Sequence, residues 1–365
     1  MNVLLHGAAN VIAIGTARIF QRAGHRVIHA GYDPFSRAFF SRFCRIKKIL
    51  PDPGIDRAAY AEALARLIEE EAIALIVPTS DRDLLDLVAS EDFIPDNVAL
   101  PFPRELAMIR KVMDKGELPA ICRVADVLTP QTWSLDAGVV IPPDTVKPLV
   151  VKRRRGIAGE GFSRVDDPTL FGEIVERTRR LYPGEELLVQ ERVDGKVFGA
   201  GGIFVNGQIE RFSAYEIVAR HPAGYGTPTI CCFTKGDDLR EAMARVLSTV
   251  QWSGYCQMDF IVCEKTGEPY LVDINSVHWY TMPFSADPGL NTLFYYLGAQ
   301  ERPANRPYTT LCLSRELQRR LGGGAGKGWP KYLHRSDFYW DPAPIVFAPL
   351  LRRLRQRRHS GMEVD

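Results

Sequence analysis

The first 112 residues alternate short apolar runs with stretches of helical periodicity. The runs Val3–His6, Arg26–Ala30 and Ala74–Val77 are long enough for buried strands and too short for helices. Helical spacing lies between the runs, over Thr16–Ala23 and at Tyr60, Leu64, Leu67 and Ile68. Strands that alternate with helices in this way predict a parallel α/β layer.

From residue 113 to about 300 the pattern changes to strands joined by turns. Pro148–Lys152 and Leu187–Val193 are apolar runs typical of strands. The run Val197–Val205 is followed by Asn206-Gly207, and this pair is strongly preferred in the type I′ turn of a β-hairpin. Antiparallel strands are therefore predicted to dominate the middle of the chain.

Two further apolar runs, Tyr255–Cys263 and Tyr270–Asn275, flank a short loop and predict another β-hairpin. If this loop has an odd number of residues centred on Thr266, Asp259 lies directly opposite Asp273. A two-residue Thr-Gly turn would instead shift the register and separate the two aspartates.

Opposed aspartates would form a metal site. Like charges that face each other across strands repel, and a divalent cation removes the repulsion. Asn275 would lie diagonally across from Asp259, within about 8 Å, and carboxylate and amide oxygens suit Mg²⁺. The alternative is an ordinary hairpin with a polar face in solvent. Against it, the neighbouring residues are apolar on both faces, and a buried carboxylate needs a partner.

The strand Pro148–Lys152 ends in a lysine, and a glycine-rich loop follows it. The loop contains Gly156, Gly159 and Gly161. Glycines let backbone N–H groups approach an anion closely, and Lys152 supplies a positive charge for a phosphate. The spacing does not match the GxxxxGK[ST] of a P-loop. Arg153, Arg154 and Arg155 lie between Lys152 and the first glycine. We expect at least two of these three arginines to be in solvent.

The turn after the first strand, GAANVIAIG, invites a dinucleotide-binding interpretation. Gly7 and Gly15 would approach the phosphates, and Asp33 would bind the ribose. The GxGxxG fingerprint is absent, however, and a strand-to-helix turn that needs small residues explains the stretch better. An NAD-dependent oxidoreductase is therefore the weaker alternative.

Composition narrows the class of protein. The 365 residues are 46% hydrophobic and 25% charged, which is ordinary for a soluble globular protein of two or three domains. A net charge of +2 argues against a general nucleic-acid binder. Seven cysteines without framework spacing predict free thiols in a reducing compartment. No run of about 18 apolar residues occurs and the N-terminus lacks a basic region, so we expect neither a membrane span nor a signal peptide.

Taken together, the segments resemble the ATP-grasp superfamily, in particular its carboxylate ligases with a biotin-carboxylase-like arrangement. The resemblance covers most of the chain and rests on the order of its motifs. These are LIVPTSDRDLL, Asp114-Lys115, the V-K before the glycine-rich loop, VQERV, the final hairpin and DFYWDPAPIVF.

The resemblance implies an α/β and α+β fold. An N-terminal parallel α/β (pre-ATP-grasp) domain would span residues 1–112. A two-lobed ATP-grasp domain with antiparallel sheets would span 113–300, with a small lid lobe at about 128–189. A helical C-terminal tail would span 301–365, where an apolar stripe over 347–354 predicts a helix.

The resemblance also implies roles for individual residues. ATP phosphates would be bound by Lys115 and Lys152, and covered by the loop with Gly156, Gly159 and Gly161. Adenine would be received by Gln190, Glu191 and Val193, the last two through backbone groups. Mg²⁺, with Mn²⁺ as an alternative, would be held by Asp259, Asp273 and Asn275.

The implied reaction converts a substrate carboxylate into an acyl phosphate, which an amine or another nucleophile then attacks, leaving ADP and phosphate. The implied partners are a small-molecule carboxylate and an amine, with neither nucleic acid nor a membrane span. A cytoplasmic protein is expected, with a homodimer as one arrangement.

The chain departs from the family pattern at three positions. Asp273 replaces a glutamate, Val197 replaces a ribose-binding acid, and Val277 replaces the arginine of E-x-N-P-R. His278 would point to the opposite face of the strand. We therefore hypothesise that Arg220, in the loop ARHPAGYGTP, binds the substrate carboxylate; the alternative is an ordinary surface arginine. The valine at 277 also leaves open a catalytically degenerate nucleotide-binding or regulatory protein.

Overall fold

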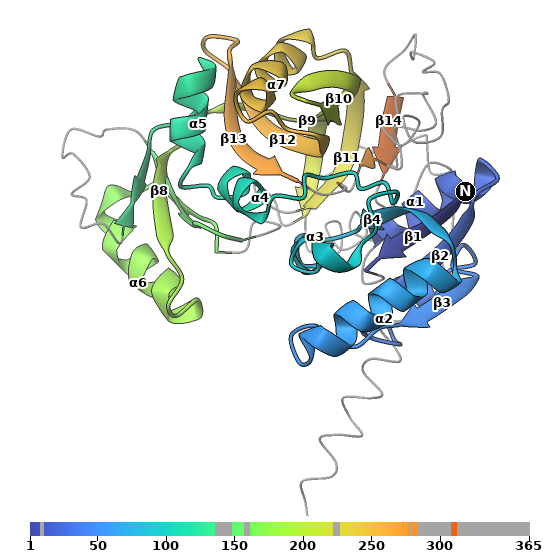
Figure 1. Cartoon of the computed structure of the whole chain (residues 1–365). Coiled ribbons are helices and arrows are strands. Elements are labelled where there is room, and N and C mark those ends of the chain that lie inside the picture. Colours follow the sequence, from blue (N-terminus) through green and yellow to red (C-terminus); the bar gives the residue numbers. More distant parts are fainter. Residues whose placement is uncertain are drawn as a thin grey trace, which may run out of the picture.

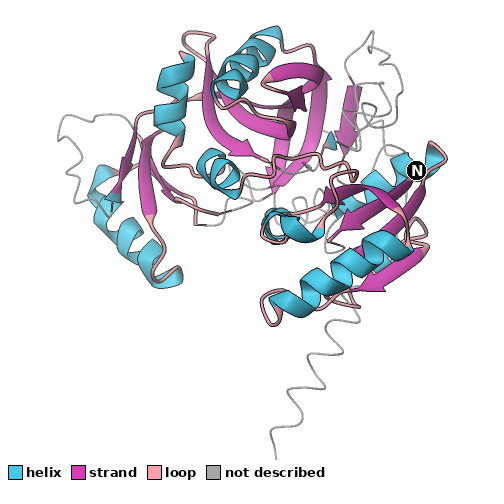
Figure 2. Cartoon of the chain, in the orientation of Figure 1, coloured by secondary structure: helices cyan, strands magenta, loops and turns pink. Residues whose placement is uncertain are grey.

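The computed structural model describes residues 1–7, 11–135, 148–156, 161–221, 227–276, 279, 281–282 and 308–311. The strands in these residues form three sheets, named here sheets A, B and C (Figure 1 and Figure 2). Sheet A is parallel, whereas sheets B and C are antiparallel. The predicted combination of a parallel α/β layer with antiparallel sheets is therefore confirmed.

Sheet A is built from the apolar runs of the first part of the chain. Its strand order is β3-β2-β1-β4, with β1 at Asn2–His6, β2 at Arg26–Gly31, β3 at Ile46–Ile49 and β4 at Ile73–Pro78. Its helices are α1 at Val11–Arg22, α2 at Arg57–Glu70 and α3 at Asp81–Val88. Alternate β1 residues face opposite layers: Leu4 packs in one cluster with Leu64 of α2, and Leu5 in another with Phe20 of α1.

Helix α1 starts earlier than predicted. It begins at Val11 rather than Thr16, and Gly15 lies within it. A glycine inside a helix does not form the phosphate-binding turn of a dinucleotide site. The dinucleotide interpretation of this stretch therefore loses one of its two glycines.

Sheet C is the large central sheet in Figure 1, with the order β13-β12-β9-β10-β11-β14. Its strands are β9 at Gly195–Val205, β10 at Gln208–His221, β11 at Thr227–Thr234, β12 at Gly254–Cys263, β13 at Pro269–Asn275 and β14 at Tyr308–Leu311. Asn206 and Gly207 join β9 to β10 with φ of 50° and 76°. Both values are positive, as a type I′ turn requires, so the predicted hairpin is confirmed.

Sheet B lies apart from sheet A, on the other side of sheet C (Figure 1). Its order is β5-β8-β6-β7, with β5 at Thr132–Ser134, β6 at Leu149–Arg153, β7 at Ser163–Val165 and β8 at Leu187–Glu191. Helix α6, Phe171–Leu181, covers one face, where Val175 packs among apolar residues of β6, β7 and β8.

The remaining helices join these layers. They are α4 at Leu106–Val112, α5 at Leu118–Ala125 and α7 at Asp237–Thr249, and short 3₁₀ helices lie at Arg37–Phe40, Glu91–Phe93 and Pro168–Leu170. One core cluster runs from sheet A through α4 and α5 to α7 and sheet C. The strands that carry the site therefore rest on a continuous packed core, which limits their movement.

Of the predicted tail, the structure describes strand β14, which pairs with β11 and extends sheet C. The helix predicted over 347–354 and the DFYWDPAPIVF motif lie outside the described residues. In the part of the chain that is described, no helix has the length and apolar character needed to cross a membrane.

Candidate active site

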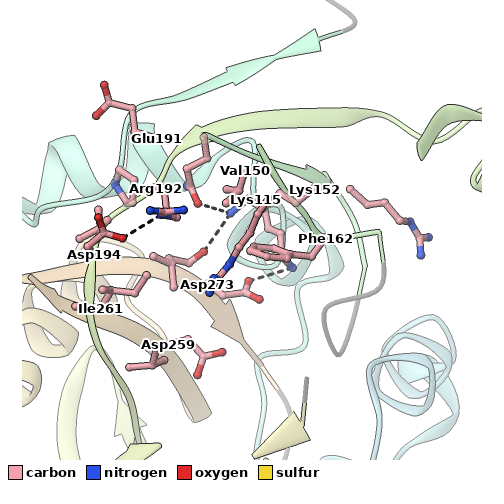
Figure 3. Close-up of a pocket in the computed structure, with 18 of the residues that line it drawn as sticks. Lys115, Val150, Lys152, Phe162, Glu191, Arg192, Asp194, Asp259, Ile261 and Asp273 are labelled. Atoms are coloured by element: carbon pink, nitrogen blue, oxygen red, sulfur yellow. Dashed lines mark hydrogen bonds and ion pairs between the residues drawn. The ribbon is translucent and has the colours of Figure 1, made fainter. Parts of the chain in front are cut away.

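A cavity of about 340 Å³ lies between sheet B and sheet C (Figure 3). Strands of both sheets and the segment after α4 form its wall. The predicted site residues on this wall are Lys115, Lys152, Gly156, Gln190, Glu191, Val193, Arg220, Asp259 and Asp273. Asn275 and Gly161 are described but do not line it, and Gly159 lies outside the described residues.

Lys152 reaches the cavity from the buried strand β6. Its Nζ donates to Gln190 Oε1 at 3.0 Å and to Val272 O at 3.5 Å, and its residue is 8% exposed. Gln190 is itself held, because its Nε2 donates to Thr132 Oγ1 at 2.8 Å. Burial lowers the pKa of Lys152 to about 8, although nearby Asp273 acts in the opposite direction. The lysine is thus a fixed cation with few partners, as phosphate binding requires.

Lys115 lies just after α4 and faces the same cavity. Its Nζ is 3.1 Å from Asp273 Oδ1 and donates to Gly156 O at 3.0 Å (Figure 3). The adjacent Asp114 fixes this segment, since its carboxylate accepts from Arg154 Nε at 2.6 Å and from Gly116 N at 2.8 Å. The DK motif is therefore tied to the end of β6, and both lysines face one space.

Asp259 and Asp273 are paired directly across β12 and β13, as predicted. The loop is not the predicted one, however. Cys263 N donates to Glu268 O at 2.9 Å, which closes an even loop of four residues, 264–267. A bulge between Asp259 and Phe260 then shifts the register by one residue and restores the opposition.

The side chains of the paired aspartates are half-buried. Burial raises the pKa of Asp259, and the charge of Asp273 adds to this effect, while Arg220 opposes it. The oxygen donors are two carboxylates and a nearby amide, and none of the described residues that line the cavity offers sulfur or imidazole. This donor set fits a hard cation such as Mg²⁺.

Arg220 lies near the end of β10, at a position that pairs with Pro228 of β11. It is half-buried, lines the cavity and is close enough to Asp259 to influence that carboxyl group. Arg220 therefore faces the same cavity as the two aspartates. Val277 and His278, which raised the question of the missing cation, lie outside the described residues.

The VQERV segment forms one wall of the cavity at the end of β8. The N–H of Glu191 donates to Gln131 O at 2.9 Å, so this N–H is already used within the protein. Arg192 N donates to Pro148 O at 2.8 Å, which ties the segment to β6. Val197 also lines the cavity.

The arginines after Lys152 are not a solvated run, which corrects the prediction. The Arg153 side chain is 15% exposed, bonds to Glu185 Oε1 at 2.7 Å and lies over the ring of Tyr182. Arg154 is 22% exposed and pairs with Asp114. Arg155, at 70% exposed, is the one of the three in solvent. The sequence shows the charges but not the distant acids that pair with them.

Asp81 is a carboxylate near the site that the sequence interpretation missed. It lies in the first turn of α3, and its Oδ1 is buried without a hydrogen-bond partner among the described residues. Burial and the charge of Asp273 raise its pKa to about 6, and Lys115 opposes the rise. The signal was its place in LIVPTSDRDLL, directly after a parallel strand, where ligand-binding residues of α/β sheets gather.

No protein-family model matches this chain, and no curated protein matches it significantly. Solved structures do match. A carboxyaminoimidazole ribonucleotide synthase from Aspergillus clavatus, complexed with ATP, matches with a TM-score of 0.65 and 12% identity, covering 88% of this chain and 85% of that one.

Two further structures share the arrangement. The biotin carboxylase domain dimer of the Hydrogenobacter thermophilus 2-oxoglutarate carboxylase, complexed with MgADP and bicarbonate, has a TM-score of 0.60 and 14% identity over 81% of this chain and 68% of that one. An L-amino acid ligase from Bacillus licheniformis has a TM-score of 0.52 and 16% identity over 76% and 66%. The chain has the ATP-grasp fold, as its motifs implied.

Proposed function

We propose that this protein is an ATP-dependent ligase that activates a substrate carboxylate as an acyl phosphate and joins it to an amine. One observation carries the proposal. Two lysines, a directly opposed pair of aspartates and an arginine line one cavity of about 340 Å³ between two antiparallel sheets. This is the set of charges that phosphoryl transfer from ATP to a carboxylate needs.

ATP would enter between sheets B and C. Lys115 and Lys152 would bind its phosphates, with the backbone around Gly156 and Gly161, and with Gly159 of the same loop, beside them. Gln190 and the backbone of Glu191 and Val193 would border the adenine. Oxygens of Asp259, Asp273 and Asn275 would hold Mg²⁺, which when bound neutralises charge on the phosphates.

In the first step a carboxylate oxygen attacks the γ-phosphorus of ATP. A new C–O–P link forms, the bond from the γ-phosphorus to the β,γ-bridging oxygen breaks, and ADP leaves. In the second step the amine attacks the acyl carbon, the C–O bond to phosphate breaks, and the amine gives up a proton. No side-chain nucleophile is needed, so the protein contributes by positioning and by electrostatics.

Arg220 would hold the substrate carboxylate beside the γ-phosphate. The two anions repel, and a guanidinium group can bind a carboxylate through two parallel hydrogen bonds. The position of Arg220 beside Asp259 supports this role, because the γ-phosphate would lie near the metal ligands. The similar solved structures add support, because one is complexed with ATP, one with MgADP, and one is an L-amino acid ligase.

The proposal is tested by ADP release with pooled carboxylates and amines. We expect ADP formation that requires a member of the carboxylate pool and Mg²⁺. Arg220→Gln should lower kcat/KM for the carboxylate by about 2–4 kcal/mol, roughly 30- to 1000-fold, and leave ATP affinity within about threefold. Arg240→Gln, in the exposed face of α7, is the matched control and should behave as wild type. Lost ATP binding with unchanged carboxylate kinetics would place Arg220 in the nucleotide site instead.

The assembly and location stay predictions. The dimeric neighbour supports a homodimer, which light scattering on the purified chain would test. The cytoplasmic location stays an expectation from the sequence.

A further inference from the structure

The hairpin that carries the two aspartates also carries a hydrogen-bonded chain of amides. Gln257 lies directly opposite Asn275, one same-face step along from the pair Asp259 and Asp273. Asn275 Nδ2 donates to Gln257 Oε1 at 2.7 Å, and Gln257 Nε2 donates to Asp259 Oδ1 at 2.7 Å. Gln257 is 3% exposed, so water does not compete for these bonds. It therefore links two of the proposed metal ligands directly.

The donor and acceptor groups fix the direction of these hydrogen bonds. An ionised carboxylate only accepts hydrogen bonds, so the NH₂ group of Gln257 must face Asp259. The amide oxygen of Gln257 must then face Asn275, which has to present its own NH₂ group. The amide oxygen of Asn275 consequently points away from Gln257. Gln257 Nε2 also donates to Met258 O at 3.0 Å, so two groups that can only accept, this carbonyl and the Asp259 carboxylate, together decide the orientation of both amides.

On each aspartate, one carboxylate oxygen is already engaged by neighbouring groups of the protein. Asp259 uses Oδ1 to accept from Gln257, and Asp273 uses Oδ1 to accept from Ile274 N at 3.0 Å and to pair with Lys115. The second oxygen of each carboxylate takes no hydrogen bond from the described part of the chain. The oxygens left for a cation are Asp259 Oδ2, Asp273 Oδ2 and Asn275 Oδ1.

The neighbouring strand offers Gln257 no other side-chain partner. The residues of β9 that face Gln257 and Asp259 are Gly201 and Gly199. A Cβ at Gly201 would lie 2.5 Å from the Trp279 ring, and a Cβ at Gly199 would lie 2.3 Å from Tyr215. Side chains on that side are thus excluded by packing. Gln257 therefore bonds a side chain of β13, Asn275, and none of β9.

We propose that Gln257 is a positioning residue that turns the oxygens of Asn275 and Asp259 toward one hard cation. The inference rests on the metal site of the proposed function. A purely structural glutamine would also satisfy its neighbours, but its loss would affect stability and not metal affinity. Residues that orient metal ligands typically change affinity about 10- to 100-fold when replaced.

The test measures Mn²⁺ binding by electron paramagnetic resonance, with ADP present, so that turnover is not needed. Gln257→Met keeps the volume and removes the three side-chain hydrogen bonds, which join Gln257 to Asn275, Asp259 and the carbonyl oxygen of Met258. We expect its Mn²⁺ affinity to fall about 10- to 100-fold, with ADP affinity in EDTA within about threefold of wild type. Met258→Val, on the opposite face of β12, is the control; it should lower the melting temperature and leave Mn²⁺ affinity unchanged.

Gln257→Leu provides a second variant. It is also uncharged and removes the same hydrogen bonds, so we expect Mn²⁺ binding to weaken to a similar extent. Unchanged Mn²⁺ affinity in either folded variant would overturn the inference while the metal site itself stands. Wild-type protein that binds ADP but no Mn²⁺ would overturn the metal site, and the inference with it.

Discussion

The low pKa of Lys152 predicts that nucleotide affinity falls as the pH rises through about 8. Burial makes the charged form of this lysine less favourable in the protein without nucleotide. Phosphate groups bind the protonated amine and raise its pKa in the complex. Nucleotide binding is therefore coupled to proton uptake above pH 8, and stronger binding is expected on the acidic side.

The size of the effect follows from the pKa. With a value of about 8, about three quarters of Lys152 is protonated at pH 7.5 and about a tenth at pH 9. If the bound form stays protonated at pH 9, ADP affinity falls about eightfold over this range, or about 1.3 kcal/mol. The ADP phosphates are already ionised between pH 7.5 and pH 9, so they do not contribute to this change in affinity.

Calorimetry of ADP binding in EDTA measures this directly. Lys152→Met should bind ADP about 10- to 100-fold more weakly at pH 7.5, a loss of about 1.5–3 kcal/mol for a charged hydrogen bond. Its affinity should then be nearly the same at pH 7.5 and pH 9. Lys235→Met, at an exposed lysine outside the cavity, should retain the wild-type slope. A flat wild-type profile, or the full slope in Lys152→Met, would refute the reasoning.

Four further substitutions test the charges around the metal site. Asp259→Asn and Asp273→Asn should each reduce Mg²⁺-dependent ADP formation by orders of magnitude, with melting temperatures in EDTA equal or higher because repulsion is relieved; a large loss of metal-free stability in both would indicate a structural pair. Lys115→Met should strengthen Mn²⁺ binding without nucleotide, measured by electron paramagnetic resonance, because Lys115 no longer pairs with Asp273; weaker binding would contradict this. Asp81 has a folded-state pKa of about 6, above its unfolded value of about 3.9, so stability is lost as pH rises from about 4 to 6. Asp81→Asn should therefore raise urea stability at pH 7.5 by up to about 3 kcal/mol, and a destabilised variant would speak against a buried charge.

Most of the fold could be predicted from local pattern. The strands around Val3–His6 and Leu187–Val193, the Asn206-Gly207 turn and the helical spacing of α2 all match the structure. Apolar periodicity reports burial, and turn residues report backbone conformation, so both are visible in the sequence. The start of α1 was misplaced because Gly15 was read as a turn, although a single glycine is tolerated inside a helix.

The candidate site was predictable where neighbours along a strand define it. The opposition of Asp259 and Asp273 was predicted, but from an odd loop; the structure has an even loop and a compensating bulge. A bulge depends on packing against neighbouring strands and leaves no clear signal in the sequence. The pairing of Arg154 with Asp114 and the approach of Asp81 to Asp273 join segments far apart in the chain. Such contacts follow from the tertiary arrangement and not from local pattern.

Positional isotope exchange tests the ligase proposal most directly, because it detects the acyl phosphate without knowledge of the amine. ATP carrying ¹⁸O in its β,γ-bridge is incubated with the protein, Mg²⁺ and pooled carboxylates, and ³¹P NMR follows the bridge oxygen. We predict that the label moves to a non-bridging position only when a carboxylate is present, and that Arg220→Gln suppresses this exchange. A bridge oxygen that stays in place with every carboxylate, in protein shown to bind ATP, would contradict the ligase chemistry and favour a nucleotide-binding protein.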